Sequence, residues 1–154
     1  MRVRHLLAAF LALCVVAAIR PASAGEFGTK DEAVALVMQA IARVGEVGMD
    51  TASKEFMDHN GKYVDRDLYL IVVDLQGVRV VHGQNPKLVG KSYNDAVDVN
   101  GKEYGKEVMQ IAAGPGSGWV SFMFKDPITG KILPKQNYVE RAGDYIYLAG
   151  VYTR

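Results

Sequence analysis

The sequence predicts an α+β domain in which a long N-terminal helix precedes a five-stranded antiparallel sheet. Three observations support this class. Apolar residues recur at helical spacing after Thr29, two short β-type runs follow, and three more such runs close the chain after a single helical stretch. Runs of strands separated by one helical crossover are typical of an antiparallel sheet with helices on one side.

Residues 1–24 have the features of an export signal. Two arginines precede an apolar run from Leu6 to Ile19, and the small residues Ala22-Ser23-Ala24 follow as a cleavage site. We therefore expect a cut after Ala24 and a periplasmic or secreted product. The apolar run is shorter than the roughly 20 residues that cross a bilayer, so an uncleaved anchor is the alternative.

Composition excludes several functional classes. Cleavage would leave 130 of the 154 residues, a size that suits one domain spanning residues 25–154. The net charge would change from +1 to −2, because three arginines leave with the signal and every Asp and Glu stays. This charge does not favour nucleic acid as a partner. Cys14, the sole cysteine, lies in the signal, so we expect no disulfide, no thiolate metal site and no cofactor.

The first helix of the domain begins at Thr29. Thr29 followed by Glu32 is a capping-box signature, and apolar residues from Val34 to Val44 recur at helical spacing. Glycines then loosen the pattern, and a shorter helix runs from Thr51 to about Asn60-Gly61. We expect one long helix with a kink or a break.

The strands follow in two groups. Leu68 to Val73 and Val78 to His82 form a hairpin around the turn Asp74-Leu-Gln-Gly77. A long loop from Asn85 to Asn100 leads to a helix that starts there or one residue later and ends before Gly114. The last three strands are Trp119 to Phe124, Ile132 to Arg141 and Tyr145 to Tyr152.

Catalytic and metal-binding motifs are missing from this pattern. No serine stands in a Gly-x-Ser-x-Gly elbow, and the glycine-rich segment 114–118 follows a helix and lacks the Lys-Ser or Lys-Thr of a phosphate-binding loop. Asp98, Asn100 and Glu107 fit part of an EF-hand loop, but its first ligand position would be Ala96. We expect a turn there, no metal site, and no enzymatic activity.

Six segments, in order along the chain, resemble the single Cache domain family of extracellular ligand sensors. The resemblance covers about residues 56–152 and implies a PAS-like fold, with a small ligand between the sheet and the crossover loops and helix. It also implies a non-catalytic sensor, since members usually form the outer part of bacterial chemoreceptors, histidine kinases and cyclases and lean towards organic acids as ligands. The segments are Asp67-Leu-Tyr-Leu, Asp74-Leu-Gln-Gly, Asn85-Pro-Lys-Leu-Val-Gly-Lys, Gly118-Trp-Val-Ser-Phe, Pro134-Lys135 and Ala149-Gly-Val-Tyr152.

The resemblance puts Lys135 on a pocket-facing strand, where its ammonium would donate to a ligand carboxylate. Without the resemblance, Lys135 would be read as a solvated lysine at a strand end. Tyr69 needs a partner for its hydroxyl if it is buried, either the ligand or the backbone. Tyr138 shares that ambiguity, although strand alternation puts it on the opposite face from Lys135. His82 would lie at the pocket mouth or on the surface. The predicted ligand-binding residues are Lys135, Tyr69, His82, Tyr138, Phe122 and Phe124.

These features lead to the hypothesis of an exported, stand-alone sensor module. It would bind a small organic acid or amino-acid-like metabolite and present it to a membrane receptor, histidine kinase or transporter. No signalling domain follows Tyr152, which departs from the commonest arrangement in the family. The alternative is a structural module with a vestigial pocket, in which the N-terminal helix forms a homodimer through Val37 and Ile41.

Overall fold

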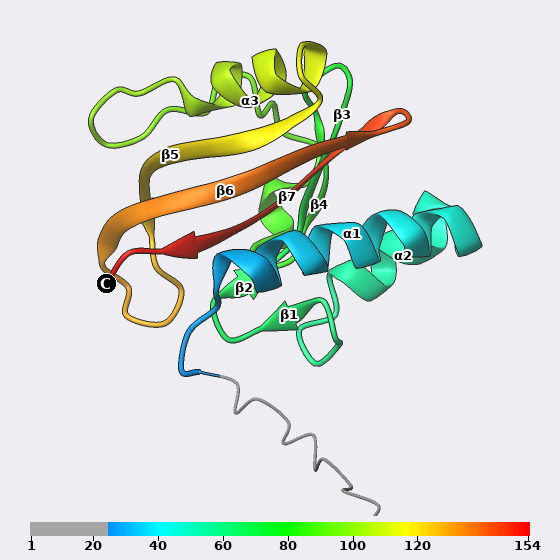
Figure 1. Ribbon diagram of the computed structural model, residues 1–154, viewed down its shortest axis with the longest axis horizontal. Helices are drawn as coiled ribbons and strands as arrows, with labels where there is room; N and C mark the ends of the chain where they lie inside the picture. The colour runs from blue at the N-terminus through cyan, green and yellow to red at the C-terminus, as the bar shows by residue number, and fades with distance from the viewer. Residues whose placement is uncertain (1–24) are drawn as a thin grey trace, which may run out of the picture.

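The computed structural model describes residues 25–154, so the predicted export signal and its cleavage position lie outside the described residues. Two helices open the domain, a small and a large sheet follow, and a third helix connects the two halves of the large sheet (Figure 1). The elements are α1 (Lys30–Val47), α2 (Met49–Phe56), β1 (Val64–Asp65), β2 (Leu68–Tyr69), β3 (Ile71–Asp74), β4 (Arg79–His82), the 3-10 helix η1 (Pro86–Leu88), α3 (Tyr104–Ala113), β5 (Ser117–Lys125), β6 (Ile132–Ala142) and β7 (Tyr145–Tyr152).

The N-terminal helices form as the sequence predicts. The Thr29 hydroxyl accepts the Glu32 N–H at 3.2 Å and the Glu32 carboxylate accepts the Thr29 N–H at 2.7 Å, so the capping box is confirmed. The predicted break lies at Gly48, whose φ of 78° favours glycine. Val37 is fully buried against the sheet, and Ile41 packs beside it, so this face of α1 belongs to the domain's own core.

The large sheet has the strand order β4-β3-β7-β6-β5, and every neighbouring pair is antiparallel. β7 lies in the middle and is buried along most of its length, as its continuous apolar run requires. On β6, Lys135 pairs with Tyr152 of β7 and with Phe122 of β5. The small sheet pairs β2 with β1, a two-residue strand too short to leave an alternating pattern in the sequence.

The expectation that the helices would cover one side of the sheet is wrong. α1 and α2 pack on one face, together with Leu70, Val72 and Tyr147, whereas α3 packs on the other, together with Ile71 and Leu148 (Figure 1). Hydrophobic periodicity identifies the buried stripe of a helix but does not say which face of a sheet that stripe covers. The domain therefore has two apolar layers, one on each side of the sheet.

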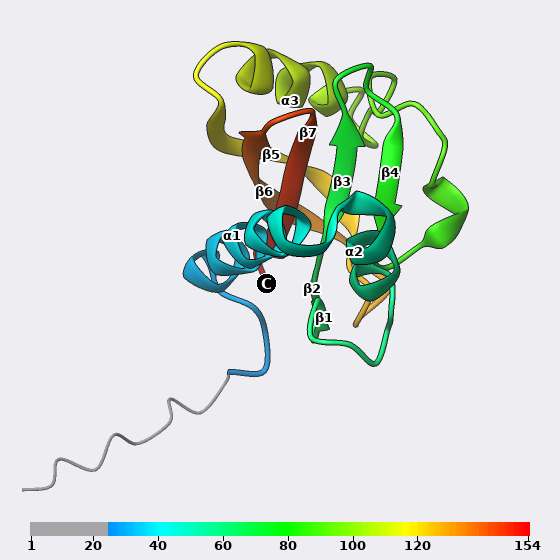
Figure 2. The same cartoon turned by 90° about the vertical axis from the view of Figure 1, so that its right-hand side faces the viewer.

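The segment between β4 and α3 runs beside the sheet edge and rises to the face that α3 covers (Figure 2). It supplies backbone partners to β4, since the Arg79 N–H donates to the Lys91 carbonyl at 3.1 Å and the Gly90 N–H donates to the Arg79 carbonyl at 2.8 Å. Its last part is a turn held by Asp98, whose carboxylate accepts the Lys102 N–H at 2.9 Å. This turn delays the start of α3 to Tyr104, later than the sequence pattern predicts.

None of the helices in the described part of the chain combines the length and the hydrophobicity that a membrane span requires.

Candidate ligand-binding pocket

A cavity of about 390 Å³ lies on the α3 side of the sheet, a volume within the usual range for small-molecule sites. Its wall is built from the large sheet, from Tyr69 of β2, from α3, and from the segment that joins β4 to α3. Five of the six predicted ligand-binding residues line it, namely Lys135, Tyr69, His82, Phe122 and Phe124. The structure thus gathers residues from four strands around one partly open pocket.

Lys135 is the first of two buried cations in this wall. Only 2% of the residue is exposed, so the alternative of a solvated strand-end lysine is wrong. Its Nζ donates to the Tyr69 hydroxyl at 2.7 Å and lies 4.1 Å and 4.8 Å from the centroids of the Tyr69 and Tyr152 rings. No carboxylate within residues 25–154 forms an ion pair with it. Burial lowers the pKa of Lys135 to about 7, although the nearby charges of Asp67 and Asp126 oppose this shift.

Tyr69 and His82 form the adjoining part of the wall. Their rings stack with centroids 5.4 Å apart, and both residues are buried, so the alternative of a surface histidine is wrong. The Asn85 N–H donates to His82 Nδ1 at 3.0 Å, which puts the imidazole proton on Nε2. Burial, together with the positive charges of Lys135 and Arg79, lowers the pKa of His82 to about 3. The imidazole is therefore neutral at physiological pH.

Arg79 is the second buried cation, and it is absent from the residues that the sequence singled out. Its Nη1 donates to the Ser92 carbonyl at 2.6 Å, and its guanidinium lies 4.6 Å from the centroid of the Tyr93 ring. Its Nε is buried without a hydrogen-bond partner, and no carboxylate in the described residues forms an ion pair with it. Because Arg79 lines the cavity, its guanidinium is a candidate for contact with a ligand.

A β-bulge explains why sequence reasoning missed Arg79. Ile71 of β3 pairs with His82, and Val73 pairs with Arg79, so one extra residue lies between them on β4. Strict alternation over three residues would put Arg79 and His82 on opposite faces, whereas the bulge brings both to the cavity. The sequence signal that could have identified Arg79 was a charged residue inside a strand. The face of the sheet to which its side chain points, however, depends on the bulge.

Aromatic rings form the apolar part of the cavity wall. The rings of Tyr104 and Phe122 stack with centroids 4.0 Å apart, Tyr93 meets Tyr104 edge-on at 5.8 Å, and Phe124 meets Phe122 at 5.9 Å. Burial raises the pKa of the Tyr93 hydroxyl beyond its ordinary range, so this tyrosine stays protonated. These rings thus offer apolar contact to a ligand.

Tyr138 does not reach the cavity. As strand alternation predicts, its side chain lies on the opposite face from Lys135, where it packs against Trp119 with ring centroids 5.4 Å apart. Its hydroxyl donates to the Glu140 carboxylate. Tyr138 therefore belongs to the layer that α1 covers.

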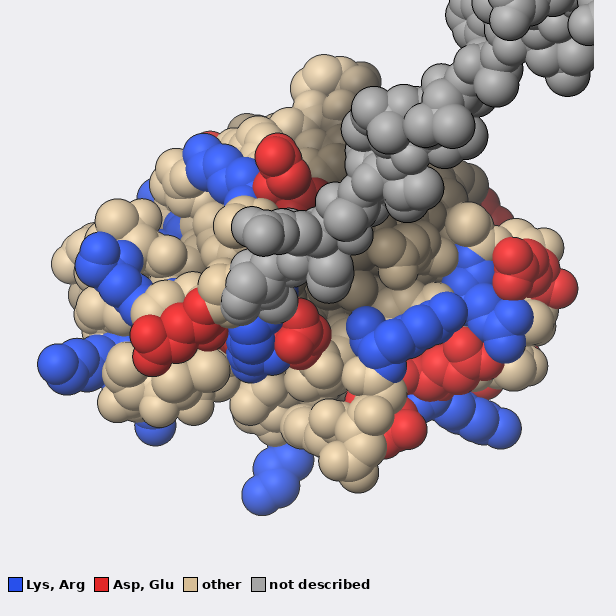
Figure 3. All heavy atoms as spheres, turned by 60° about the horizontal axis from the view of Figure 1, so that its bottom comes forward, with Lys and Arg blue, Asp and Glu red and all other residues tan. Residues whose placement is uncertain are grey.

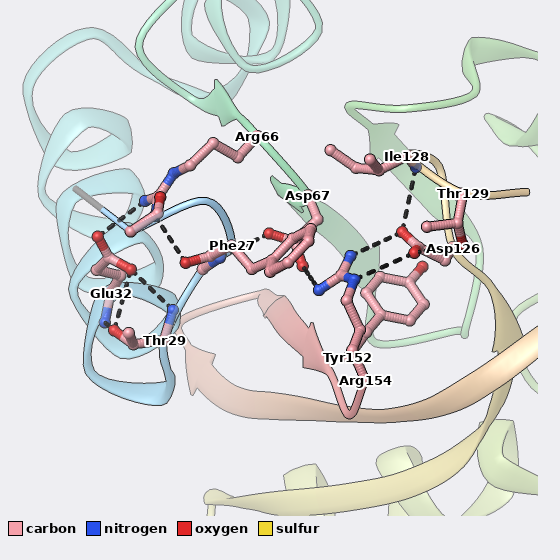
Figure 4. Close-up of polar contacts among 12 residues, drawn as sticks. Phe27, Thr29, Glu32, Arg66, Asp67, Asp126, Ile128, Thr129, Tyr152 and Arg154 are labelled. Atoms are coloured by element: carbon pink, nitrogen blue, oxygen red, sulfur yellow. Dashed lines mark hydrogen bonds and ion pairs between the residues drawn. The ribbon is translucent and has the colours of Figure 1, made fainter.

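A polar network lies behind Lys135, away from the cavity. Arg154 forms ion pairs with Asp67 at 2.9 Å and with Asp126 at 2.8 Å, and both carboxylates are fully buried (Figure 4). The Gly28 N–H donates to Asp67 at 2.7 Å, and the Arg154 guanidinium lies 3.7 Å from the centroid of the Phe27 ring. This network ties the start of the domain, the β1–β2 turn and the β5–β6 loop to the strand that carries Tyr152.

The pocket lies between an antiparallel sheet and its helical crossover, and its two buried cations form no ion pair within residues 25–154, so the site is suited to a small anionic ligand. The model of the family single Cache domain 2 matches residues 26–148, and the chain belongs to this family. Cache domains are extracellular or periplasmic ligand-binding modules without catalytic activity. Both the resemblance to this family and the fold class that the sequence predicted are confirmed.

Solved structures of sensor domains share the fold. A methyl-accepting chemotaxis protein from Vibrio parahaemolyticus RIMD 2210633 has a TM-score of 0.68 at 22% identity, over 80% of this chain and 87% of that one. A periplasmic sensor domain of a chemotaxis protein has a TM-score of 0.62 at 26% identity, over 80% and 90%. A Cache chemosensory domain, solved as a basis for carboxylic acid recognition, has a TM-score of 0.68 at 22% identity, over 80% and 92%. No curated protein matches the sequence.

Proposed function

We propose that this protein is an exported sensor module that binds a small carboxylate-bearing metabolite in the cavity, with Lys135 as the principal hydrogen-bond donor to the carboxylate. One observation carries the proposal. The Lys135 ammonium is buried in the wall of a ligand-sized cavity, and its sole hydrogen-bond partner among the described residues is the neutral Tyr69 hydroxyl. A buried charge without a counter-ion is unfavourable, and an anionic ligand would remove that penalty.

The geometry around Lys135 suits a carboxylate. An ammonium has three donors, and Tyr69 accepts one of them, so two remain for the ligand. Each charge-assisted hydrogen bond of this kind contributes about 1.5–3 kcal/mol. The rings of Phe122 and Phe124 offer apolar contact to the rest of the ligand, and the neutral His82 imidazole can donate from Nε2.

The proposal includes export and a membrane partner. The signal in residues 1–24, with a cut after Ala24, would release one domain of residues 25–154 outside the cytoplasm. The bound form would then be presented to a membrane receptor, histidine kinase or transporter. Acidic and basic side chains are interspersed across the face shown in Figure 3, which gives no support to a nucleic-acid partner on that face.

The alternative, a homodimer through the N-terminal helix with a vestigial pocket, has less support. Val37 and Ile41, which would form the dimer face, already pack against the domain's own sheet. A vestigial cavity also has no need to keep cations buried without partners, because apolar side chains would fill the same space at lower cost.

A binding experiment on the purified protein tests the proposal. Titration calorimetry with acetate, propionate and butyrate should detect binding, and Lys135→Met should abolish it while the protein stays folded. Lys131→Met, which removes an exposed lysine just before the same strand, is the matched control and should bind normally. A folded protein that binds none of these acids, nor any dicarboxylate, would refute the proposal.

A further inference from the structure

The cavity contains two buried cations instead of one. Lys135 is 2% exposed and Arg79 is 8% exposed, and neither forms an ion pair with a carboxylate in residues 25–154. Asp95 is the acidic residue of the wall, and it is exposed. The cavity therefore presents two positive groups, and no buried carboxylate of the described residues contacts either of them. A single ligand carboxylate at Lys135 would leave the Arg79 guanidinium unpaired.

The two cations are held at separate places. Arg79 lies on β4, Lys135 lies on β6, and two strands of the sheet stand between them. Arg79 is fixed by its bond to the Ser92 carbonyl and by the Tyr93 ring, whereas Lys135 is fixed by the Tyr69 hydroxyl. Each side chain is tied to its own surroundings, so the two are poorly arranged to converge on one group.

A series of aromatic contacts leads from one cation to the other. The Arg79 guanidinium lies over the Tyr93 ring, Tyr93 meets Tyr104, and Tyr104 stacks on Phe122. Phe122 pairs directly with Lys135 across the β5–β6 ladder. The surface between the two positive groups is thus largely aromatic and offers apolar contact to a short methylene chain.

We infer that the cavity binds a short dicarboxylate, with one carboxylate at Lys135 and the other at Arg79. This inference rests on the proposed function and names its ligand class. The guanidinium suits the second carboxylate because Arg79 lines the cavity and its hydrogen bonds within the described residues use Nη1 alone, while Nε has no partner. A cavity of about 390 Å³ also leaves room for an acid longer than three carbons.

The decisive experiment compares, on the unmodified protein, two ligands that have the same four-carbon chain and unequal charge. Succinate and its monomethyl ester differ by one negative group, and calorimetry at pH 7 and constant ionic strength should show succinate binding at least about tenfold more tightly. Malonate and glutarate, measured in parallel, report the span between the cations. Arg79→Met should reduce the preference for succinate over the ester to within about threefold, while the ester still binds.

Control variants keep the outcome clear. Lys131→Met should retain the full preference, since Lys131 is exposed. If Arg79→Met does not fold, Arg79→Lys keeps the charge but loses the fork, and should lose part of the preference. Equal affinity for the dicarboxylates, their monoesters and propionate would overturn the inference and leave the proposed function intact. Binding of no acid at all would overturn both.

Discussion

The Nζ atom of Lys135 lies 2.7 Å from the hydroxyl oxygen of Tyr69, and both residues are almost completely buried. This pair joins β6 to β2, two strands that are far apart in the sequence and belong to different sheets. A neutral partner orients the ammonium without cancelling its charge. The pair therefore keeps Lys135 directed into the cavity and available to an anion.

Replacing Tyr69 by Phe should weaken acid binding by about 1 kcal/mol, because Lys135 loses the hydrogen bond that orients it. The ring would still stack on His82, but the buried Lys135 would lose its sole hydrogen-bond partner among the described residues, so the free energy of unfolding should also fall, by about 1–3 kcal/mol. Tyr138→Phe is the matched control, since that hydroxyl lies on the other face of the sheet, bonded to Glu140. Calorimetry measures the affinity of both variants for the acid. Equal losses of affinity in the two variants would contradict this role of Tyr69.

Binding of an acid should take up a proton above pH 7. Burial lowers the pKa of free Lys135 to about 7, and a bound carboxylate raises it again by stabilising the charged form. Affinity should therefore fall by up to about tenfold per pH unit from pH 7 towards the pKa of the complex. Calorimetry at pH 8, in two buffers with different ionisation enthalpies, counts the protons. An affinity that stays constant between pH 7 and 9 would exclude this linkage.

Acidification should destabilise the unliganded protein in part through His82. Its pKa is about 3 in the fold, against about 6.5 in the unfolded chain, so the unfolded state binds more protons between these values. Stability from this residue is complete above about pH 6.5 and is lost by up to about 1.4 kcal/mol per unit as the pH falls towards 3.

Urea unfolding at pH 6.5, 5.5 and 4.5 measures this slope, with His82→Gln for comparison. The variant should show a shallower loss of stability on acidification. His59→Gln removes an exposed histidine and should keep the steep slope of the unmodified protein. Parallel curves for His82→Gln and the unmodified protein would show that other groups carry the acid response.

Removing the Arg154 guanidinium should cost about 3 kcal/mol of unfolding free energy, because Asp67 and Asp126 would stay buried without a counter-ion. Arg154→Gln is the test. Arg43→Gln is the control, since Arg43 pairs with Glu55 and Glu46 where solvent reaches the side chains, and such pairs contribute at most about 1 kcal/mol. Urea unfolding at pH 7 compares them, and a loss below that of Arg43→Gln would contradict a structural role for the network.

Local signals predicted much of the fold. The capping box of Thr29 and Glu32, the break at Gly48 and the bounds of β7 follow from propensity, turn chemistry and apolar runs. Local signals could not predict which side of the sheet each helix covers, because this depends on the path of the chain in space. The strand β1 could not be predicted either, because two residues are too few to show an alternating pattern of apolar and polar side chains.

The candidate site, like the fold, was predicted from the sequence only in part. Lys135, Tyr69 and His82 meet at the cavity although the residues alone left a solvated or surface position open for two of them. Burial decides between those alternatives, and burial is a property of the assembled domain. Arg79 was missed because alternation along β4 changes at the bulge.

That extra residue in β4 makes the electrostatics of the pocket a matter of strand pairing as well as of residue type. If β4 paired with β3 in unbroken register, Arg79 would point through the sheet into the apolar layer beneath α1 and α2, where a guanidinium is far more costly. That penalty disfavours the unbroken pairing. A shift of one residue in the pairing of the edge strand β4 would thus change the pocket from one with two cations to one with a single cation, although no amino acid would change.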